Sequence, residues 1–143
     1  MNTKRFTPKI DKLYWILCGI TNAVCVPLLL IVPFFSPMTA FITVPIFVFT
    51  NYFFISPLFG YVELREKELF IKYGFILKRS IPYGKVRSVA KERKFYTESM
   101  LSLKNAFEHV NIKYNTFDVT AVSVADNDEF IAELNAKVND IQK

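Results

Sequence analysis

The sequence predicts an α+β protein: an N-terminal transmembrane helical hairpin followed by a small antiparallel β-barrel or sandwich with a C-terminal capping helix. The main observation is that residues 13–62 are 50 consecutive positions without Asp, Glu, Lys, Arg or His. After residue 60 the sequence changes to short runs in which apolar and polar residues alternate, as in β-strands. In its last segment the apolar residues recur at the spacing of an α-helix. We therefore divide the chain into a basic N-terminus (1–12), the hairpin (13–59) and a domain (60–143).

This composition excludes two classes of protein. About 18 uncharged apolar residues suffice to predict a membrane-spanning helix, so the uncharged stretch excludes a wholly soluble enzyme. The chain also contains 15 Phe and 7 Tyr, which are too many for a disordered, solvated coil.

The uncharged stretch fits two spans. Residues 13–32 and 38–59 each have the roughly 20 residues that cross a hydrocarbon core at 1.5 Å per residue. The segment Pro33-Phe34-Phe35-Ser36-Pro37 predicts the turn between them. Prolines inside both spans predict kinks. No ionisable side chain lies at bilayer depth, which argues against an ion or proton pathway.

Basic residues flank the hairpin on both sides. They are Lys4, Arg5, Lys9 and Lys12 before it and Arg65, Lys67 and Lys72 after it. The positive-inside rule then predicts a protein of the cell membrane with two spans and both termini in the cytoplasm. A cleaved signal is disfavoured because the apolar run exceeds a signal core of 7–15 residues. A single long, kinked or interfacial anchor would put the N-terminal cluster on the wrong side.

The domain is expected to contain six strands and one helix. The strands are expected at residues 61–65, 69–73, 76–81, 86–93, 110–114 and 117–124, the last two joined by Asn115-Thr116. In the helix, Asp126 is a candidate N-cap and Glu129 completes a capping box. Its predicted apolar stripe is Phe130, Leu134, Val138 and Ile141.

No catalytic, cofactor-binding or metal site is predicted. His109 is the only histidine, and strand alternation places it on an exposed face with Asn111 and Lys113. Cys18 and Cys25 are about 10 Å apart along a helix, too far for a disulfide. Enzymatic activity is therefore the least favoured hypothesis.

One basic series is a candidate binding face. Lys85, Arg87, Lys91 and Arg93 are odd-numbered and would share one face if the whole series were extended. Near a membrane this face would attract anionic lipid, and it is a candidate face for another partner as well. The alternative is a solvated face that only reflects the positive-inside bias. Nucleic acid is disfavoured because few aromatic residues are interleaved with the charges and the tail is acidic.

Several weak motifs occur in a characteristic order. They are Leu69-Phe70-Ile71-Lys72-Tyr73-Gly74, then Ile81-Pro82-Tyr83-Gly84-Lys85-Val86-Arg87-Ser88-Val89, then Ser99-Met100-Leu101-Ser102-Leu103, and finally the helix start at 126–134. Residues 61 to about 138 thereby resemble the bacterial pleckstrin-homology (PH)-like domain family, in its YyaB-like branch. The resemblance implies a PH-like sheet domain with a C-terminal helix.

The combination of a membrane hairpin with such a domain is similar to the immunity protein of sublancin producers. This implies a non-enzymatic protein that protects the cell from a peptide antimicrobial at the cytoplasmic membrane face. The implied partners are the lipid bilayer and a peptide bacteriocin or another membrane protein. Two alternatives remain, an accessory or regulatory subunit of a membrane complex and an anionic-lipid-binding module. Gly19, Thr21 and Ala23 would allow the close helix approach that a subunit needs.

Overall fold

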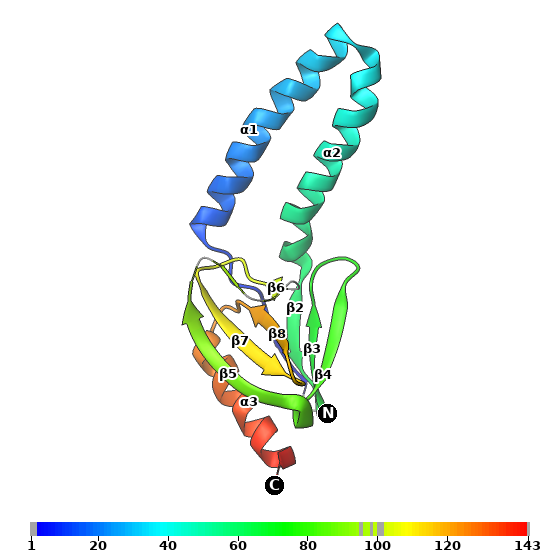
Figure 1. Ribbon diagram of the computed structural model, residues 1–143. Coiled ribbons are helices and arrows are strands. Elements are labelled where there is room, and N and C mark those ends of the chain that lie inside the picture. The colour runs from blue at the N-terminus through cyan, green and yellow to red at the C-terminus, as the bar shows by residue number, and fades with distance from the viewer. Residues whose placement is uncertain (1–2, 95, 98, 100–101, 143) are drawn as a thin grey trace.

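The computed structural model describes residues 3–94, 96, 97, 99 and 102–142. Two long helices stand on one end of a β-sandwich, and a third helix lies along the side of the sandwich (Figure 1). The two sheets are not closed into a barrel. The predicted α+β class with a helical hairpin, a sandwich and a C-terminal helix is therefore confirmed.

The hairpin consists of α1 (Lys12–Phe35) and α2 (Pro37–Ile55), and a 3-10 turn, η1 (Ser56–Phe59), follows it. The predicted five-residue turn is shortened to Ser36, whose backbone is extended. Pro37 then occupies the first turn of α2, where a missing N–H costs nothing. Both helices are long and apolar enough to cross a membrane.

Five Thr and Asn side chains in the hairpin donate hydrogen bonds to their own helix, whereas the Tyr14 hydroxyl of α1 donates to Phe54 O of α2. The donors are Thr21, Asn22, Thr43, Thr50 and Asn51, each to the carbonyl four residues earlier. Such back-bonding satisfies a polar group inside a membrane without a second partner. These side chains therefore do not indicate a polar pathway.

The domain contains two four-stranded sheets. The first has the order β1-β2-β3-β4, with bounds Lys4–Phe6, Tyr61–Leu64, Glu68–Lys72 and Lys78–Pro82. The second has the order β5-β7-β8-β6, with bounds Val86–Arg93, Glu108–Tyr114, Asp118–Val122 and Ser102–Leu103. A short 3-10 turn, η2 (Tyr83–Lys85), joins the sheets. The six predicted strands are present, and β1 and β6 are additional.

Strand β1 precedes the hairpin in the sequence but pairs with β2, which follows the hairpin. The pairs are Lys4↔Leu64, Arg5↔Glu63 and Phe6↔Val62, antiparallel. Both ends of the hairpin therefore leave the domain on the same side. A single continuous anchor with the N-terminus on the opposite side does not fit this pairing. The basic N-terminus is thus not a free tail but partly an edge strand.

The segment between β1 and α1 ties the first sheet to the second. Lys9 N donates to Ser123 O at 2.9 Å, and Ala125 N donates to Thr7 O at 3.0 Å. Further along, Asp11 N donates to Asn105 O at 3.0 Å. The entry to the hairpin is therefore fixed against the end of β8 and the chain before β7.

Helix α3 (Asn127–Gln142) covers the core. Asp126 Oδ1 accepts a bond from Glu129 N at 2.9 Å, which confirms the predicted cap. Phe130 and Leu134 are fully buried, whereas Ile141 is 46% exposed, so the apolar stripe ends one turn early. Phe130 packs edge-on against Phe6 of β1, with ring centroids 5.2 Å apart.

The connection between β7 and β8 is one residue longer than predicted. The ladder ends at Tyr114↔Asp118, so the connection spans residues 115–117. Asn115 has a φ of 52°, a conformation that Asn tolerates better than most residues. Its Nδ2 also donates to Asp118 Oδ2 at 2.7 Å. Phe117, at the tip, is 92% exposed.

A buried hydrogen bond joins the two sheets. The hydroxyl of Tyr73, directly after β3, forms a hydrogen bond with the hydroxyl of Thr120 of β8, and the two oxygens are 2.5 Å apart. Tyr73→Phe should lower the free energy of unfolding by about 1–2 kcal/mol, because a buried hydrogen bond between the sheets is lost. A double-mutant cycle with Thr120→Val, followed by urea unfolding of the full chain in detergent, measures the coupling. Additive losses would contradict a direct bond.

Candidate functional site

One end of the domain faces the hairpin, and we call it the hairpin end. Here β2 begins, β3 ends, β5 ends and β7 begins, as their pairings require (Figure 1). The opposite end, the far end, carries η2 and the turn between β7 and β8 (Figure 1).

A pocket of about 200 Å³ lies at the hairpin end, between the start of α1 and the chain that leads into β7. It is lined by Asp11, Leu13, Tyr14, Leu17, Lys94, Lys104, Asn105, Ala106 and Phe107. Leu17 belongs to the first candidate span, so the pocket reaches the level at which that span begins.

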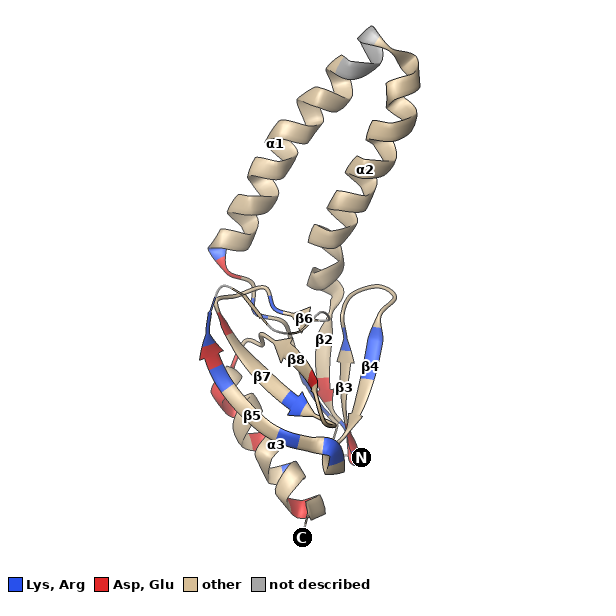
Figure 2. Ribbon diagram, viewed as in Figure 1, with Lys and Arg blue, Asp and Glu red and all other residues tan. Residues whose placement is uncertain are grey.

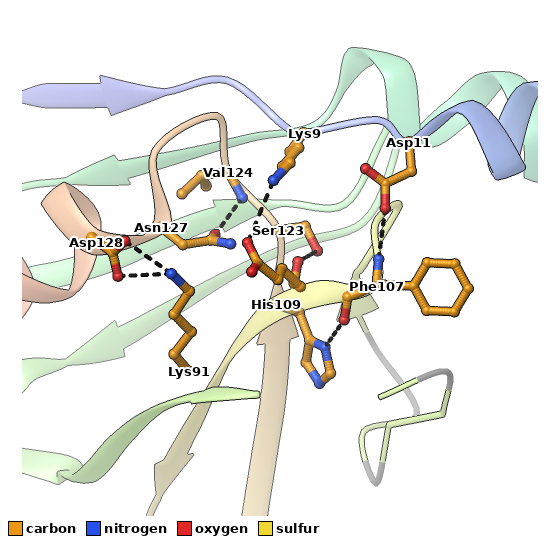
Figure 3. Close-up of polar contacts among 10 residues, drawn as sticks. Lys9, Asp11, Lys91, Phe107, His109, Ser123, Val124, Asn127 and Asp128 are labelled. Carbon is orange, nitrogen blue, oxygen red and sulfur yellow. Dashed lines mark hydrogen bonds and ion pairs between the residues drawn. The ribbon is translucent and has the colours of Figure 1, made fainter. Parts of the chain in front are cut away.

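Asp11 holds the two walls of the pocket together. Its Oδ2 accepts a hydrogen bond from Phe107 N at 2.9 Å (Figure 3). Nearby, Lys9 forms an ion pair with Glu108 at 3.6 Å. Both contacts join the residues before α1 to the start of β7. They therefore hold the two sides of the pocket in place.

Two lysines line the pocket together with the carboxylate of Asp11. Lys104 Nζ donates to the carbonyl oxygen of Lys94, and burial lowers the pKa of Lys104. Lys94 Nζ lies 3.0 Å from a carboxylate oxygen of Glu92. Apolar walls with a few polar and charged groups suit an amphipathic ligand, such as a lipid or a peptide.

A comparison with family models identifies the family of this domain. The model described as bacterial PH domain matches residues 60–138, more than half of the chain. The chain belongs to the bacterial PH domain family. Searches of curated proteins and of solved structures find no significant match. PH domains are generally non-catalytic.

The predicted basic face of this PH domain is not one strand face. Lys85 lies in η2, before the strand, and the register shifts between Val86 and Ser88, so Arg87 sits in a bulge. Only Lys91 and Arg93 keep the expected alternation. The prediction that the four basic residues share one face because they are odd-numbered is therefore wrong. A bulge changes which side chains lie on the same face.

The four basic residues also lie at different distances from the hairpin. β5 runs from the far end to the hairpin end, and the span from residue 85 to 93 is about 25 Å at 3.3 Å per residue (Figure 2). That distance exceeds the Debye length of roughly 8–10 Å. A bilayer crossed by the hairpin would attract Arg93 but not Lys85. Whether the four bind any partner stays a prediction.

Lys91 is engaged within the PH domain. Its Nζ lies 2.9 Å from both carboxylate oxygens of Asp128 on α3 (Figure 3), and this bond raises the pKa of Lys91. Asp128→Asn should leave the urea-unfolding midpoint of the full chain nearly unchanged, because exposed ion pairs contribute little. A large shift in that midpoint would show that the pair stabilises the helix.

The prediction that His109 is exposed is wrong. Its side chain is fully buried, and Nδ1 lies 3.0 Å from Phe107 O (Figure 3). Strand alternation assumes one wet face, but β7 is buried on both faces near the hairpin end. Only Lys113, towards the far end of the same face, is exposed as expected.

Sequence reasoning missed the pocket of the PH domain. Its two walls are about 90 positions apart in sequence, and residues 94–107 carry no clear period. Residues 100–101, in the middle of the Ser99–Leu103 motif, lie outside the described residues. Ser102–Leu103 forms β6, parallel to β8.

Proposed function

We propose that this protein is a non-enzymatic, membrane-anchored PH domain protein of the cell membrane. The hairpin spans the bilayer twice, both termini lie in the cytoplasm, and the domain binds an amphipathic ligand at its hairpin end. The ligand we favour is a membrane-active peptide, which makes the protein an immunity protein of the kind that its resemblance to the sublancin system implies.

The pairing of β1 with β2 is the observation that carries the anchored arrangement. It requires the chain to leave the domain, form the hairpin and return to the same sheet. With basic residues on both flanks, the positive-inside rule favours the cytoplasm for that side. The pocket between α1 and the domain then lies where a peptide entering from the bilayer would arrive.

Membrane anchoring is tested by extraction and labelling. The protein should remain in carbonate-washed membranes, and cysteines placed at either terminus should react with an impermeant maleimide only after lysis. Cys18 and Cys25, which are free thiols, are first replaced by serine. Labelling of either terminus in intact cells would overturn the proposed orientation.

The immunity role is tested with a matched pair of variants. Expression in a sensitive host should raise the inhibitory concentration of sublancin or of another peptide in a bacteriocin panel. Phe107→Ala should abolish this protection, because Phe107 forms a pocket wall and is 39% exposed. Phe117→Ala removes the same ring at the far end and should protect like the wild type. Unchanged sensitivity to every peptide with the wild-type protein would exclude the immunity role.

One observation favours a second function, that of an accessory subunit. A Cβ built on Gly19 would meet no atom within 4 Å, so the small-residue face of α1 at this position is not used by α2. Such a face allows close contact with another helix. Gly19→Leu would then reduce co-purification of a partner in mild detergent, whereas a protein that purifies alone would exclude this function.

A further inference from the structure

The loop between β3 and β4, residues 73–77, exposes three consecutive apolar side chains. Phe75 is 47% exposed, Ile76 75% and Leu77 53%. The loop is nevertheless ordered, because Tyr73 N donates to Leu77 O at 2.8 Å. A run of exposed apolar residues at a loop tip is costly in water and typical of a surface that contacts something else.

This loop is attached to the end of the second candidate span. The Phe75 ring lies 4.7 Å from that of Phe59 and 6.0 Å from that of Tyr52, centroid to centroid. Phe75 N also donates to Ser56 Oγ at 3.2 Å. Figure 1 shows the loop rising beside the lower end of α2. The loop therefore lies level with residues 52–59.

That level is the edge of a bilayer crossed by the hairpin. A hydrocarbon core of about 30 Å takes roughly 20 helical residues, so a core entered at Pro37 ends near residue 57. Aromatic rings are favoured at this boundary, and Tyr52, Phe59 and Phe75 are gathered there. Two lysines lie at the base of the loop, because Lys72 and Lys78 are Cα partners at the last ladder position.

We propose that this loop is a third membrane contact, in which Ile76 and Leu77 enter the headgroup–acyl boundary and Lys72 and Lys78 bind lipid phosphates. The inference rests on the proposed function, since it requires the hairpin to span the bilayer. The occupant is the lipid itself. The loop would hold the hairpin end of the domain against the membrane and so limit the tilt of the domain on its two helices.

The test uses the full chain in nanodiscs of phosphatidylcholine and phosphatidylglycerol. In a variant with Cys18→Ser and Cys25→Ser, single cysteines are introduced as Ile76→Cys, Phe117→Cys and Phe41→Cys and labelled with the environment-sensitive dye NBD. We expect dye at position 76 to be blue-shifted and quenched by lipids that carry a doxyl group near the headgroup. Dye at position 117, which is at the far end, should be quenched by aqueous iodide instead.

Position 41 separates the two proposals. Phe41 is 83% exposed on α2, so its dye reports whether the hairpin lies in lipid. If the dye at position 41 lies in lipid but the dye at position 76 lies in water, the proposed membrane contact of the loop is overturned and the proposed function is not. If both dyes lie in water, the proposed function is overturned as well. A blue shift at position 76 without doxyl quenching would show a protein contact, which also overturns the lipid contact.

The role of Lys72 and Lys78 is tested by varying the negative charge of the membrane. Doxyl quenching at position 76 should increase with the phosphatidylglycerol content, and Lys72→Gln with Lys78→Gln should remove this increase. The matched variant carries Lys85→Gln and Lys113→Gln, two exposed lysines towards the far end, and should keep it. Loss of the increase in both variants, or in neither, would overturn the role of Lys72 and Lys78.

Discussion

Phe130→Ala should destabilise the domain by about 3–5 kcal/mol, the usual cost of removing a fully buried aromatic side chain. Phe130 has no exposed surface and contacts Phe6 of β1, so its loss opens a cavity between α3 and the strand that precedes the hairpin. Pulse proteolysis of the detergent-solubilised full chain in urea measures the change. Because the unfolding free energy of a native protein is only about 5–15 kcal/mol, a largely unfolded domain is also an expected result.

The control for this variant is Phe117→Ala, which removes the same ring from a side chain that is 92% exposed. Surface substitutions usually change stability by less than about 0.5 kcal/mol. Equal losses in the two variants would contradict the placement of α3 over the core.

Gly74→Ala should have the second largest effect, because Gly74 has a φ of 134°, which side chains rarely adopt. A Cβ there would also lie 1.9 Å from Ser56 Oγ and 2.9 Å from Ser56 O. The backbone strain alone costs about 1–3 kcal/mol. We therefore expect the loop to detach from η1, with faster hydrogen exchange at Phe75 N as the measurement.

Two further variants separate the causes of that effect. Adding Ser56→Gly to Gly74→Ala removes the Ser56 hydroxyl but leaves the carbonyl at position 56 and the positive φ at position 74. The slow hydrogen exchange at Phe75 N should therefore be restored only in part. Gly84→Ala is the matched control, since a Cβ there would meet no atom within 4 Å and the φ of Gly84 is not positive. Full rescue by Ser56→Gly would show that the hydroxyl clash, and not the backbone, limits position 74.

Local patterns predicted most of the fold. The absence of charge over residues 13–62 identified the hairpin, and alternation located six strands, because both signals lie within a few neighbouring residues. Strand β1 was missed, since the three residues Lys4–Phe6 have no pattern of their own and their partners follow the hairpin. The bulge at Arg87 and the burial of His109 depend on packing between distant segments, which alternation does not report.

The candidate site was less predictable than the fold. Its pocket joins residues 11–17 to residues 94–107, and no single segment carries a recognisable motif. The loop at residues 73–77 was not predicted: Ile76 and Leu77 were expected in a strand at residues 76–81, but β4 begins at Lys78. Its role follows from contacts with Tyr52, Ser56 and Phe59, which belong to a different part of the chain.

The pairing of Lys4–Phe6 with Tyr61–Leu64 has a consequence for biosynthesis. The ribosome completes the first strand of the sheet long before its neighbour, because the whole hairpin is translated between them. In the proposed orientation, that strand would wait in the cytosol while the two helices enter the lipid, and the sheet would close only after Tyr61–Leu64 has been made. A nascent chain that stalls within the hairpin would therefore expose Phe6 and an unpaired strand edge.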